Sequence, residues 1–316
     1  MTKKIVIVGA GISGLSVAWQ LDKNKYQIVV VSREFFPDLT SNRAAAFWFP
    51  YHIRHDARGI QWARASYDFF ISLAGKKGTG ISRCPLIKVV PDHVMEQDDW
   101  INFMPEGSVS KMLSGDLPKG YSTGYKASVP LMETQIFLPW LQEQLVYSGV
   151  QFIKKEVTSL NLLQMDNDVV INCSGLGART LCNDKSMIPV RGQVVLLEPG
   201  YPDEIFLDNH LPCYIVPRKD STIVGGTYEE NIGEAVTVDS DLNEILRKAF
   251  SVYPKLTVRK VIGSWAGLRP YREKIRLEME AGTNIIHNYG HGGSGFTLSF
   301  GCAAEVAMLV EKCLSI

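Results

Sequence analysis

The stretch Ile5-Val6-Ile7-Val8-Gly9-Ala10-Gly11-Ile12-Ser13-Gly14 decides the fold. Its first four residues are apolar, as in a parallel strand that is buried on both faces. The next apolar residues have helical spacing, and a second β-rich run extends from Gln27 to Ser32. The motif G-x-G-x-x-G therefore lies between a strand and a helix of a βαβ unit, and this context predicts dinucleotide binding.

Each glycine of the motif has a mechanical role in such a site. Gly9 permits the tight turn, Gly11 lets the backbone approach a pyrophosphate, and Gly14 lets the helix pack against the strand. The helix N-terminus adds unpaired N–H groups and a partial positive charge. We therefore predict cofactor contacts at Gly9, Ala10, Gly11, Ile12, Ser13 and Gly14. The alternative is a glycine-rich turn that binds no ligand.

The second strand ends at two charged residues, Arg33 and Glu34. Glu34 stands 20 residues past the third glycine (34 − 14), where an acidic side chain commonly binds the ribose hydroxyls. Arg33 comes first, and it could instead lie over the adenine or near a 2′-phosphate. We predict that both residues contact the cofactor, and the motif leaves the kind of dinucleotide open.

Two further strand-and-glycine units lie far from the first in the sequence, at 169–177 and 285–295. We expect all three units on one sheet around one extended ligand, because binding sites in open α/β sheets gather at the carboxyl ends of the strands. The segments between the units predict a second domain. Their periodicity and composition predict helices at 60–73, 134–147, 239–253 and 303–314, and strands at 190–198 and 213–228.

Composition and charge describe a folded protein without a general affinity for nucleic acid. The chain has 316 residues, enough for two domains, with 46% hydrophobic and 21% charged residues. Its 33 Lys and Arg balance 33 Asp and Glu, so no global basic field holds a phosphate backbone. No segment has the ~20 apolar residues of a membrane span. We therefore expect neither nucleic acid nor a membrane as a partner.

The six cysteines favour a reducing compartment. None forms a C-x-x-C pair, so we expect neither zinc nor another metal. A disulfide framework is not expected in so long and apolar a chain. Together with the lack of a targeting signal this predicts a cytoplasmic location, and a homodimer stays open as the oligomeric state.

Blocks of sequence along the whole chain carry a resemblance to a known family. They are Gly9 to Gly14, Ala44-Ala45 with Trp48 and Pro50-Tyr51, Asn172-Cys173-Ser174-Gly175, Arg191-Gly192-Gln193, Gly267 to Arg272 with Ile275-Arg276-Leu277, and Ile286 to Gly295 followed by Thr297. In these blocks the chain resembles the D-amino-acid oxidase family, a group of flavoproteins that includes D-aspartate oxidase.

The resemblance implies an α/β fold of two parts with FAD bound noncovalently. It implies a Rossmann-like FAD-binding domain of residues 1–50, 150–192 and 258–316, and an α+β substrate-binding domain on a mixed sheet of residues 51–149 and 193–257. Further cofactor contacts are implied at Thr40, Ser41, Ala45, Ala46, Phe47, Val157, Ser174, Gly175, Gly292, Gly293, Gly295, Phe296 and Thr297.

The implied reaction is the oxidation of a D-amino acid to an imino acid, which hydrolyses to a keto acid and ammonia. Hydride passes from the substrate Cα to flavin N5, and oxygen then reoxidises the flavin and gives hydrogen peroxide. The protein has to hold the C–H bond near the flavin and exclude water. No side chain needs to act as an acid or base if the amine arrives neutral, so we name no catalytic residue.

Three residues match substrate-binding positions of the family. Arg269 would hold the substrate carboxylate, because a guanidinium can form two charge-assisted hydrogen bonds with it. Tyr214 would add its hydroxyl, and the backbone carbonyl of Gly293 would accept a hydrogen bond from the amine. The alternatives are an ion pair for Arg269, a core position for Tyr214 and a plain turn at Gly293. His291, in the same loop, is interpreted as a hydrogen-bonded structural residue.

The predicted pocket departs from the family pattern at three further substrate-binding positions. His210 takes the place of a second tyrosine on a lid over the site. Phe49 takes the place of a glutamine that is common in the branch with neutral substrates. Tyr51 stands where D-aspartate oxidases usually have a histidine.

The charge of the substrate is predicted from arginines. No arginine lies between Arg191 and Arg218, where D-aspartate oxidases carry one for the second carboxylate. This favours neutral or apolar D-amino acids, unless Arg43, Arg54 or Arg218 turns into the pocket.

Three other functions stay open. A related amine oxidase of the glycine or sarcosine oxidase kind would keep the fold and act on a secondary amine or a specialised biosynthetic intermediate. A nicotinamide-linked dehydrogenase fits the first βαβ unit, but the two later glycine loops and the block around Arg269 argue against it. A flavoprotein without catalytic activity would be suggested by loss of Arg269, which is present.

Overall fold

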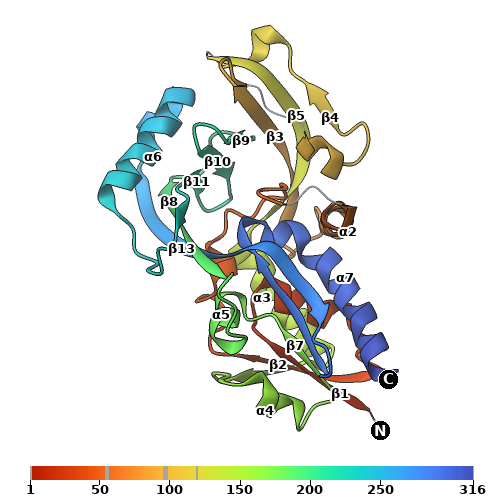
Figure 1. The fold of residues 1–316 in the computed structure, drawn as a ribbon. Coiled ribbons are helices and arrows are strands. Elements are labelled where there is room, and N and C mark those ends of the chain that lie inside the picture. The colour runs from red at the N-terminus through yellow and green to blue at the C-terminus, as the bar shows by residue number, and fades with distance from the viewer. Residues whose placement is uncertain (1, 54–56, 95–98, 119, 316) are drawn as a thin grey trace.

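One β-sheet runs through the protein (Figure 1). The computed structural model describes residues 2–53, 57–94, 99–118 and 120–315. Its strands lie in the order β4-β5-β3-β9-β10-β11-β8-β13-β14-β7-β1-β2-β6, and β12 pairs with β8. The predicted α/β fold with a mixed sheet is confirmed.

Parallel strands form the part of the sheet that the glycine motif predicted. β1 pairs with β2 and β7, β7 pairs with β14, and β2 pairs with β6, all in parallel. Ile5 and Ile7 of β1 are fully buried, as a strand covered on both faces requires. The three predicted units are neighbours on this sheet, because β14, β7 and β1 are adjacent. The strand bounds are β1 Lys3–Val8, β2 Tyr26–Ser32, β6 Gln151–Lys154, β7 Val169–Asn172 and β14 Ile285–His291.

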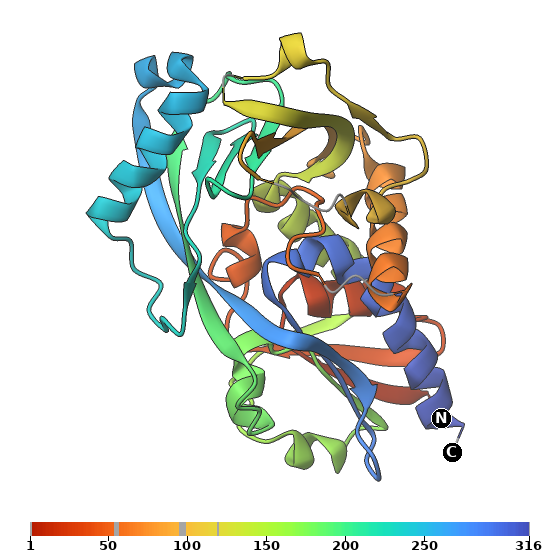
Figure 2. The ribbon, with the colours of Figure 1, turned by 45° about the horizontal axis from the view of Figure 1, so that its top comes forward.

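Mostly antiparallel strands form the other part, in which, among the described residues, β3 and β9 are the one pair in parallel. The long β13 joins the two parts, because it pairs with β8 up to Tyr271 and then with β14 (Figure 2). Its register with β14 shifts between Tyr271 and Arg276. The bounds are β3 Ile81–Pro91, β4 Val109–Lys111, β5 Tyr121–Met132, β8 Ile188–Leu197, β9 Ile205–Asp208, β10 Cys213–Pro217, β11 Thr222–Gly225, β12 Glu229–Glu230 and β13 Val261–Met279.

The predicted helices are present: the one at 134–147 has the predicted bounds, and each of the other three is shifted at one end. The helix predicted at 303–314 begins earlier, at Gly295, directly after the third glycine loop. β14 continues through His291, so that loop is shorter than its sequence indicated. The α-helices are α1 Ile12–Gln20, α2 Ala57–Leu73, α3 Thr134–Tyr147, α4 Leu160–Gln164, α5 Ala178–Leu181, α6 Asp239–Val252 and α7 Gly295–Leu314. Short 3₁₀ turns occur at Thr40–Arg43, Asp99–Phe103, Ser114–Asp116, Gly175–Gly177, Pro254–Val258 and Gly292–Ser294.

Helix α7 is the central helix of the core, where it packs against α1 and α2. Gly301 lets α2 approach closely, because a side chain there would collide with the backbone of Trp62. Ser66 of α2 accepts hydrogen bonds from the N–H groups of Phe300 (3.1 Å) and Gly301 (3.0 Å). The segment Gly292–Leu314 is long and apolar enough to cross a membrane by length and composition, yet 61% of its most apolar window is buried inside the protein. This burial is what a core helix shows.

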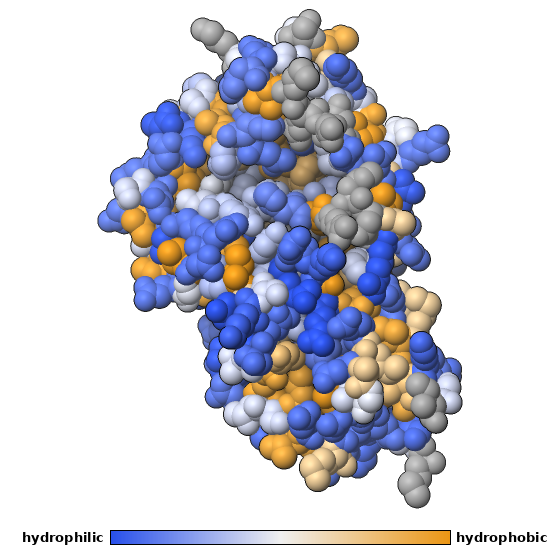
Figure 3. Space-filling model, in the orientation of Figure 1, coloured by the Kyte–Doolittle hydropathy of each residue, from blue (hydrophilic) through white to orange (hydrophobic). Residues whose placement is uncertain are grey.

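The protein has a mostly polar face, and its cysteines are reduced. The face drawn in Figure 3 carries mostly hydrophilic side chains, with small apolar patches among them. All six cysteines are free thiols.

The predicted domain boundaries stay a prediction: the one between residues 192 and 193 falls inside β8, which runs unbroken from Ile188 to Leu197.

Candidate active site

A cavity of about 1200 Å³ opens at the carboxyl ends of β1, β2 and β7. Among the predicted site residues, Gly14 and His210 lie outside its walls. The others all line it: Gly9, Ala10, Gly11, Ile12, Ser13, Arg33, Glu34, Thr40, Ser41, Ala45, Ala46, Phe47, Phe49, Tyr51, Val157, Ser174, Gly175, Tyr214, Arg269, Gly292, Gly293, Gly295, Phe296 and Thr297.

The first glycine loop has the close approaches expected of a dinucleotide turn. Gly9 has φ +107°, and a side chain on it would collide with the carbonyl of Cys173 at the end of β7. Gly14 packs against the carbonyl of Gly9, which explains why it lies behind the cavity wall. Ser41 accepts a hydrogen bond from the N–H of Ile12 at 3.0 Å, beside the free N-terminal amides of α1. These amides face a cavity and can bind a pyrophosphate.

Arg33 and Glu34 line the same cavity where β2 ends. The carboxylate of Glu34 lies 3.2 Å from Lys154 Nζ, and Arg33 lies 3.6 Å from Glu156. Both ion pairs are exposed and therefore weak, so either side chain is available to a ligand. The position of Glu34 suits the ribose hydroxyls of a dinucleotide.

Arg269 projects from β13 into the same cavity. Its guanidinium donates a hydrogen bond to the carbonyl of Thr227 at 3.0 Å and lies 5.9 Å from the ring centroid of Tyr228. Within the described parts of the chain, no carboxylate pairs with it. The remaining N–H groups of this cation are thus available to an anionic ligand.

Glycines make room for the two groups that would hold such a ligand. A side chain on Gly192 of β8 would occupy the place of the Arg269 guanidinium. A side chain on Gly225 of β11 would occupy the place of the Tyr214 ring. Gly293 lies close to Tyr51 and Arg269, since a Cβ there would lie 2.8 Å from the Tyr51 ring and 3.5 Å from Arg269 Cδ. The glycines of three separate segments thereby define one polar pocket.

Burial keeps the side chains around Arg269 neutral. Burial raises the pKa of Tyr214, and the neighbouring Arg269 opposes that shift. Burial likewise raises the pKa of Tyr51 to about 12, again against the effect of Arg269. For His52, burial and then the charge of Arg269 both lower the pKa. Arg269 is therefore the cation of a pocket whose other groups donate hydrogen bonds without charge.

Sequence reasoning missed two aromatic residues of this wall, His52 and Tyr228. Their rings stack with centroids 5.1 Å apart, and both line the large cavity. They also line a second cavity of about 260 Å³, which lies between the start of α2 and the irregular segment of β13. Tyr228 follows the cis-linked pair Gly225-Gly226 by two residues, and nothing local in the sequence marked it as part of the pocket.

The remaining predicted residues have other surroundings. The side chain of His210 is exposed, in the four-residue loop of the β9–β10 hairpin, and its N–H donates to Asp208 at 2.7 Å. Arg218 is 4% exposed, pairs with Glu133 at 3.3 Å and donates to the carbonyl of Ala44, behind the cavity wall. Arg43 lines the cavity and donates to the carbonyl of Ala266. Arg54 lies outside the described residues.

His291 is a buried residue with a partner, as predicted. Its Nε2 lies 3.1 Å from Asn288 Oδ1, and burial lowers its pKa to about 4. In the part of the chain that the structure describes, no group of three His, Cys, Asp or Glu side chains is arranged to hold a metal ion.

The family model described as FAD dependent oxidoreductase matches residues 4–309. A D-amino-acid oxidase of Rubrobacter xylanophilus is 35% identical, with 99% of this chain and 97% of that protein covered. The chain belongs to the D-amino-acid oxidase family of FAD-dependent oxidoreductases. The D-amino-acid oxidase of Streptomyces coelicolor is 33% identical, with coverage of 98% and 97%. Glycine oxidase of Geobacillus kaustophilus has the same fold, with a TM-score of 0.81 and 18% identity over 98% of this chain and 95% of that one.

The cavity fits the cofactor of this family. The turn of Gly9, the start of α1 and Ser41 can receive the pyrophosphate, and Glu34 can receive a ribose. From there the cavity continues past Ser174 to Arg269. FAD is therefore the cofactor, and the cation of Arg269 lines the same cavity.

Proposed function

We propose that this protein oxidises D-amino acids with neutral or apolar side chains. The products are the imino acid, which water hydrolyses to a keto acid and ammonia, and hydrogen peroxide from dioxygen. The observation that carries the proposal is the guanidinium of Arg269, which lies beside Tyr214 in the cofactor cavity without a carboxylate partner in the described chain.

The side chains of the pocket bind and orient the substrate. Arg269 and the neutral hydroxyl of Tyr214 receive its carboxylate, which converts an unpaired cation into a hydrogen-bonded pair. The backbone carbonyl of Gly293 accepts a hydrogen bond from the amine. Phe49 and Tyr51 keep water away from the Cα–H bond, because Phe49 is buried and Tyr51 is half-buried in the same wall. FAD, when bound, supplies the acceptor for the hydride.

The preference for uncharged side chains follows from the surroundings of the arginines. Arg218 is neutralised by Glu133, and a buried pair of this kind does not release its cation without a large cost. The β9–β10 hairpin that faces the cavity contributes Leu207, Asn209 and Pro212 but no basic side chain. Arg43 lines the cavity but already donates to the carbonyl of Ala266 at 2.8 Å, so we expect a second carboxylate on the substrate to be buried without a dedicated cation.

Anaerobic reduction of the bound flavin tests the proposal. The purified holoenzyme is mixed with single D- and L-amino acids, glycine and sarcosine, and the oxidised-flavin absorbance bands are followed. We expect bleaching by neutral D-amino acids, slower bleaching by D-aspartate, and none by L-amino acids. Bleaching by sarcosine or glycine alone would indicate an amine oxidase of the glycine or sarcosine oxidase kind and would overturn the proposal.

A further inference from the structure

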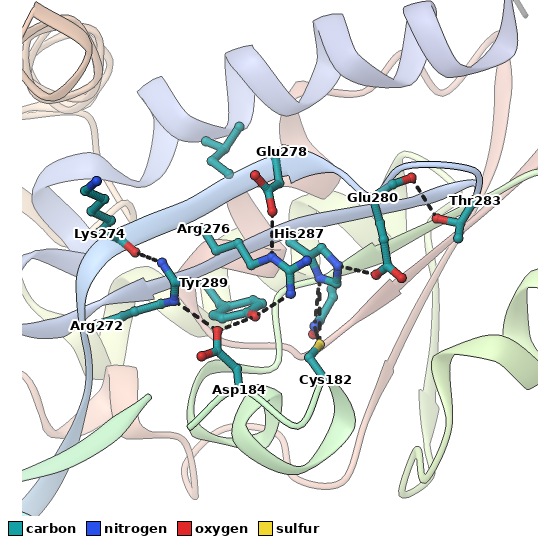
Figure 4. Close-up of polar contacts among 12 residues, drawn as sticks. Cys182, Asp184, Arg272, Lys274, Arg276, Glu278, Glu280, Thr283, His287 and Tyr289 are labelled. Carbon is teal, nitrogen blue, oxygen red and sulfur yellow. Dashed lines mark hydrogen bonds and ion pairs between the residues drawn. The ribbon is translucent and has the colours of Figure 1, made fainter. Parts of the chain in front are cut away.

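A cluster of polar side chains surrounds His287, and Figure 4 shows its contacts with Glu280 and Cys182. Asn172 at the end of β7 faces His287 of β14 across the parallel ladder, and both side chains are fully buried. His287 Nε2 lies 2.7 Å from a carboxylate oxygen of Glu280. Asn172 in turn contacts Ser174, which lines the cofactor cavity. The four residues form one continuous chain of hydrogen bonds.

The backbone determines how the amide of Asn172 is oriented. The N–H of Ser174 lies 3.2 Å from Asn172 Oδ1, and the Ser174 hydroxyl donates to the same atom at 2.6 Å. Because a backbone N–H can only donate, the amide atom on this side has to be the oxygen. The NH₂ group therefore points the other way, where it donates to Cys182 Sγ at 3.1 Å and to His287 Nδ1 at 3.3 Å.

This orientation determines the protonation state of His287. An NH₂ group offers no lone pair, so His287 Nδ1 has to be the acceptor and carries no proton. The proton of the neutral imidazole is then on Nε2, where it is donated to Glu280. Burial lowers the pKa of His287 below its ordinary value of 6.5, and Arg276 acts in the same direction. The carboxylates of Glu280 and Glu278 oppose that shift.

The other groups around His287 are paired or neutral. Arg276 donates to Glu278 at 2.8 Å and to the hydroxyl of Tyr289 at 3.0 Å, and that hydroxyl donates to Asp184 at 2.8 Å. Burial raises the pKa of the Cys182 thiol, so it is neutral as the acceptor of the Asn172 N–H. Glu280 is the residue of the chain that reaches water, since its side chain is 40% exposed.

We propose that Glu280, His287 and Asn172 form a proton-sensitive relay that positions the Ser174 turn, so that one proton taken up by His287 weakens FAD binding. Protonation places an N–H on Nδ1, directly against the NH₂ of Asn172. Relief of this donor–donor contact requires the amide to turn, and the turn removes Oδ1 from the N–H and hydroxyl of Ser174. The neighbouring Cys173 carbonyl closes against Gly9, so the shift reaches the dinucleotide loop.

Titration of the apoprotein with FAD between pH 5 and pH 8, followed by flavin fluorescence, tests the relay. For one coupled proton, the dissociation constant below the midpoint rises about tenfold per pH unit. His287→Gln offers a carbonyl to Asn172 and an amide N–H to Glu280 without a titratable group. We expect this variant to bind FAD as the wild type does at pH 8 and to lose that pH dependence. His93→Gln, at an exposed histidine, is the matched control that keeps it.

A second variant decides the question if His287→Gln does not fold. Glu280→Gln alters a partly exposed side chain and keeps an acceptor for the Nε2–H, while it removes the charge that favours protonated His287. The midpoint should then move to lower pH. An unchanged midpoint in Glu280→Gln, or an unchanged slope in His287→Gln, would overturn the proposal. Because FAD binding needs no substrate, this result stands apart from the identity of the oxidised amine.

Discussion

The guanidinium of Arg269 on β13 occupies the space that a side chain on residue 192 of β8 would need, so Gly192 gives Arg269 its place in the cavity. The two residues belong to separate sequence blocks, Arg191-Gly192-Gln193 and the block around Arg269. Neighbouring strands bring the blocks together, since the first part of β13 pairs with β8 up to Tyr271. The glycine and the arginine therefore act as one binding unit.

Gly192→Ala should displace the guanidinium and weaken substrate binding. A hydrogen bond to a charged group is worth about 1.5–3 kcal/mol, so we expect kcat/KM to fall about 10- to 100-fold with FAD retained. Steady-state kinetics and the flavin spectrum measure the two effects. Gly233→Ala, which has open space around it, serves as the control and should behave like the wild type.

Arg269→Lys should keep the charge of the pocket and lose the planar fork. A lysine ammonium cannot reproduce two parallel hydrogen bonds to a carboxylate, so kcat/KM should fall by roughly tenfold or more. The loss should appear mainly in KM, because the interaction binds the substrate before the reaction. Arg64→Lys changes an exposed arginine in the same way and should have no effect. Equal efficiency in both variants would remove Arg269 from the site.

Arg218→Met should reduce stability without altering substrate preference. It leaves Glu133 buried without its cation, which costs about 3–5 kcal/mol in comparable pairs. Urea unfolding measures the loss, and the panel of D-amino acids measures the preference. Adding Glu133→Leu should restore part of the stability. A changed preference for acidic substrates would show instead that Arg218 reaches the pocket.

The buried His291 should make the protein less stable in acid. Its pKa in the folded protein is about 4, below the ordinary 6.5, so between these values the unfolded chain binds more protons. Stability therefore falls as the pH drops from 6.5 toward 4, by up to about 3 kcal/mol at 1.36 kcal/mol per pKa unit. Urea midpoints at pH 7 and pH 5 measure the loss, which should be smaller in His291→Gln. An identical pH dependence in both proteins would contradict this.

Local patterns of the sequence predicted the cofactor half of the structure. A βαβ unit is short and its glycines lie within six residues of one another, so residues close in sequence are also close in space. The three glycine units are far apart in the sequence, but each follows a buried apolar run, and binding sites gather at the carboxyl ends of such strands, so they could be assigned to one sheet. The resemblance added Arg269, Tyr214 and Gly293, which pattern alone does not single out.

The substrate half was less predictable because its contacts join distant segments. β13 mixes exposed and half-buried residues without regular alternation, so no strand was predicted over Val261–Met279. His52 and Tyr228 meet across more than 170 residues of sequence (228 − 52), which no local rule detects. His210 was placed in the pocket by position in the family pattern, but the hairpin that carries it turns its side chain to the surface.

The unbroken β13 also limits how the protein can open. Arg269 lies midway along a strand whose first part is hydrogen-bonded to β8 and whose last part is hydrogen-bonded to β14 beside the cofactor cavity. A motion of the parallel part of the sheet against the antiparallel part would break the hydrogen bonds of β13 to β14 or to β8. We therefore expect β13 to hold the two parts in a fixed relation. Accordingly, we expect ligands to enter through movements of short loops, while Arg269 keeps its place on the sheet beside the cofactor cavity.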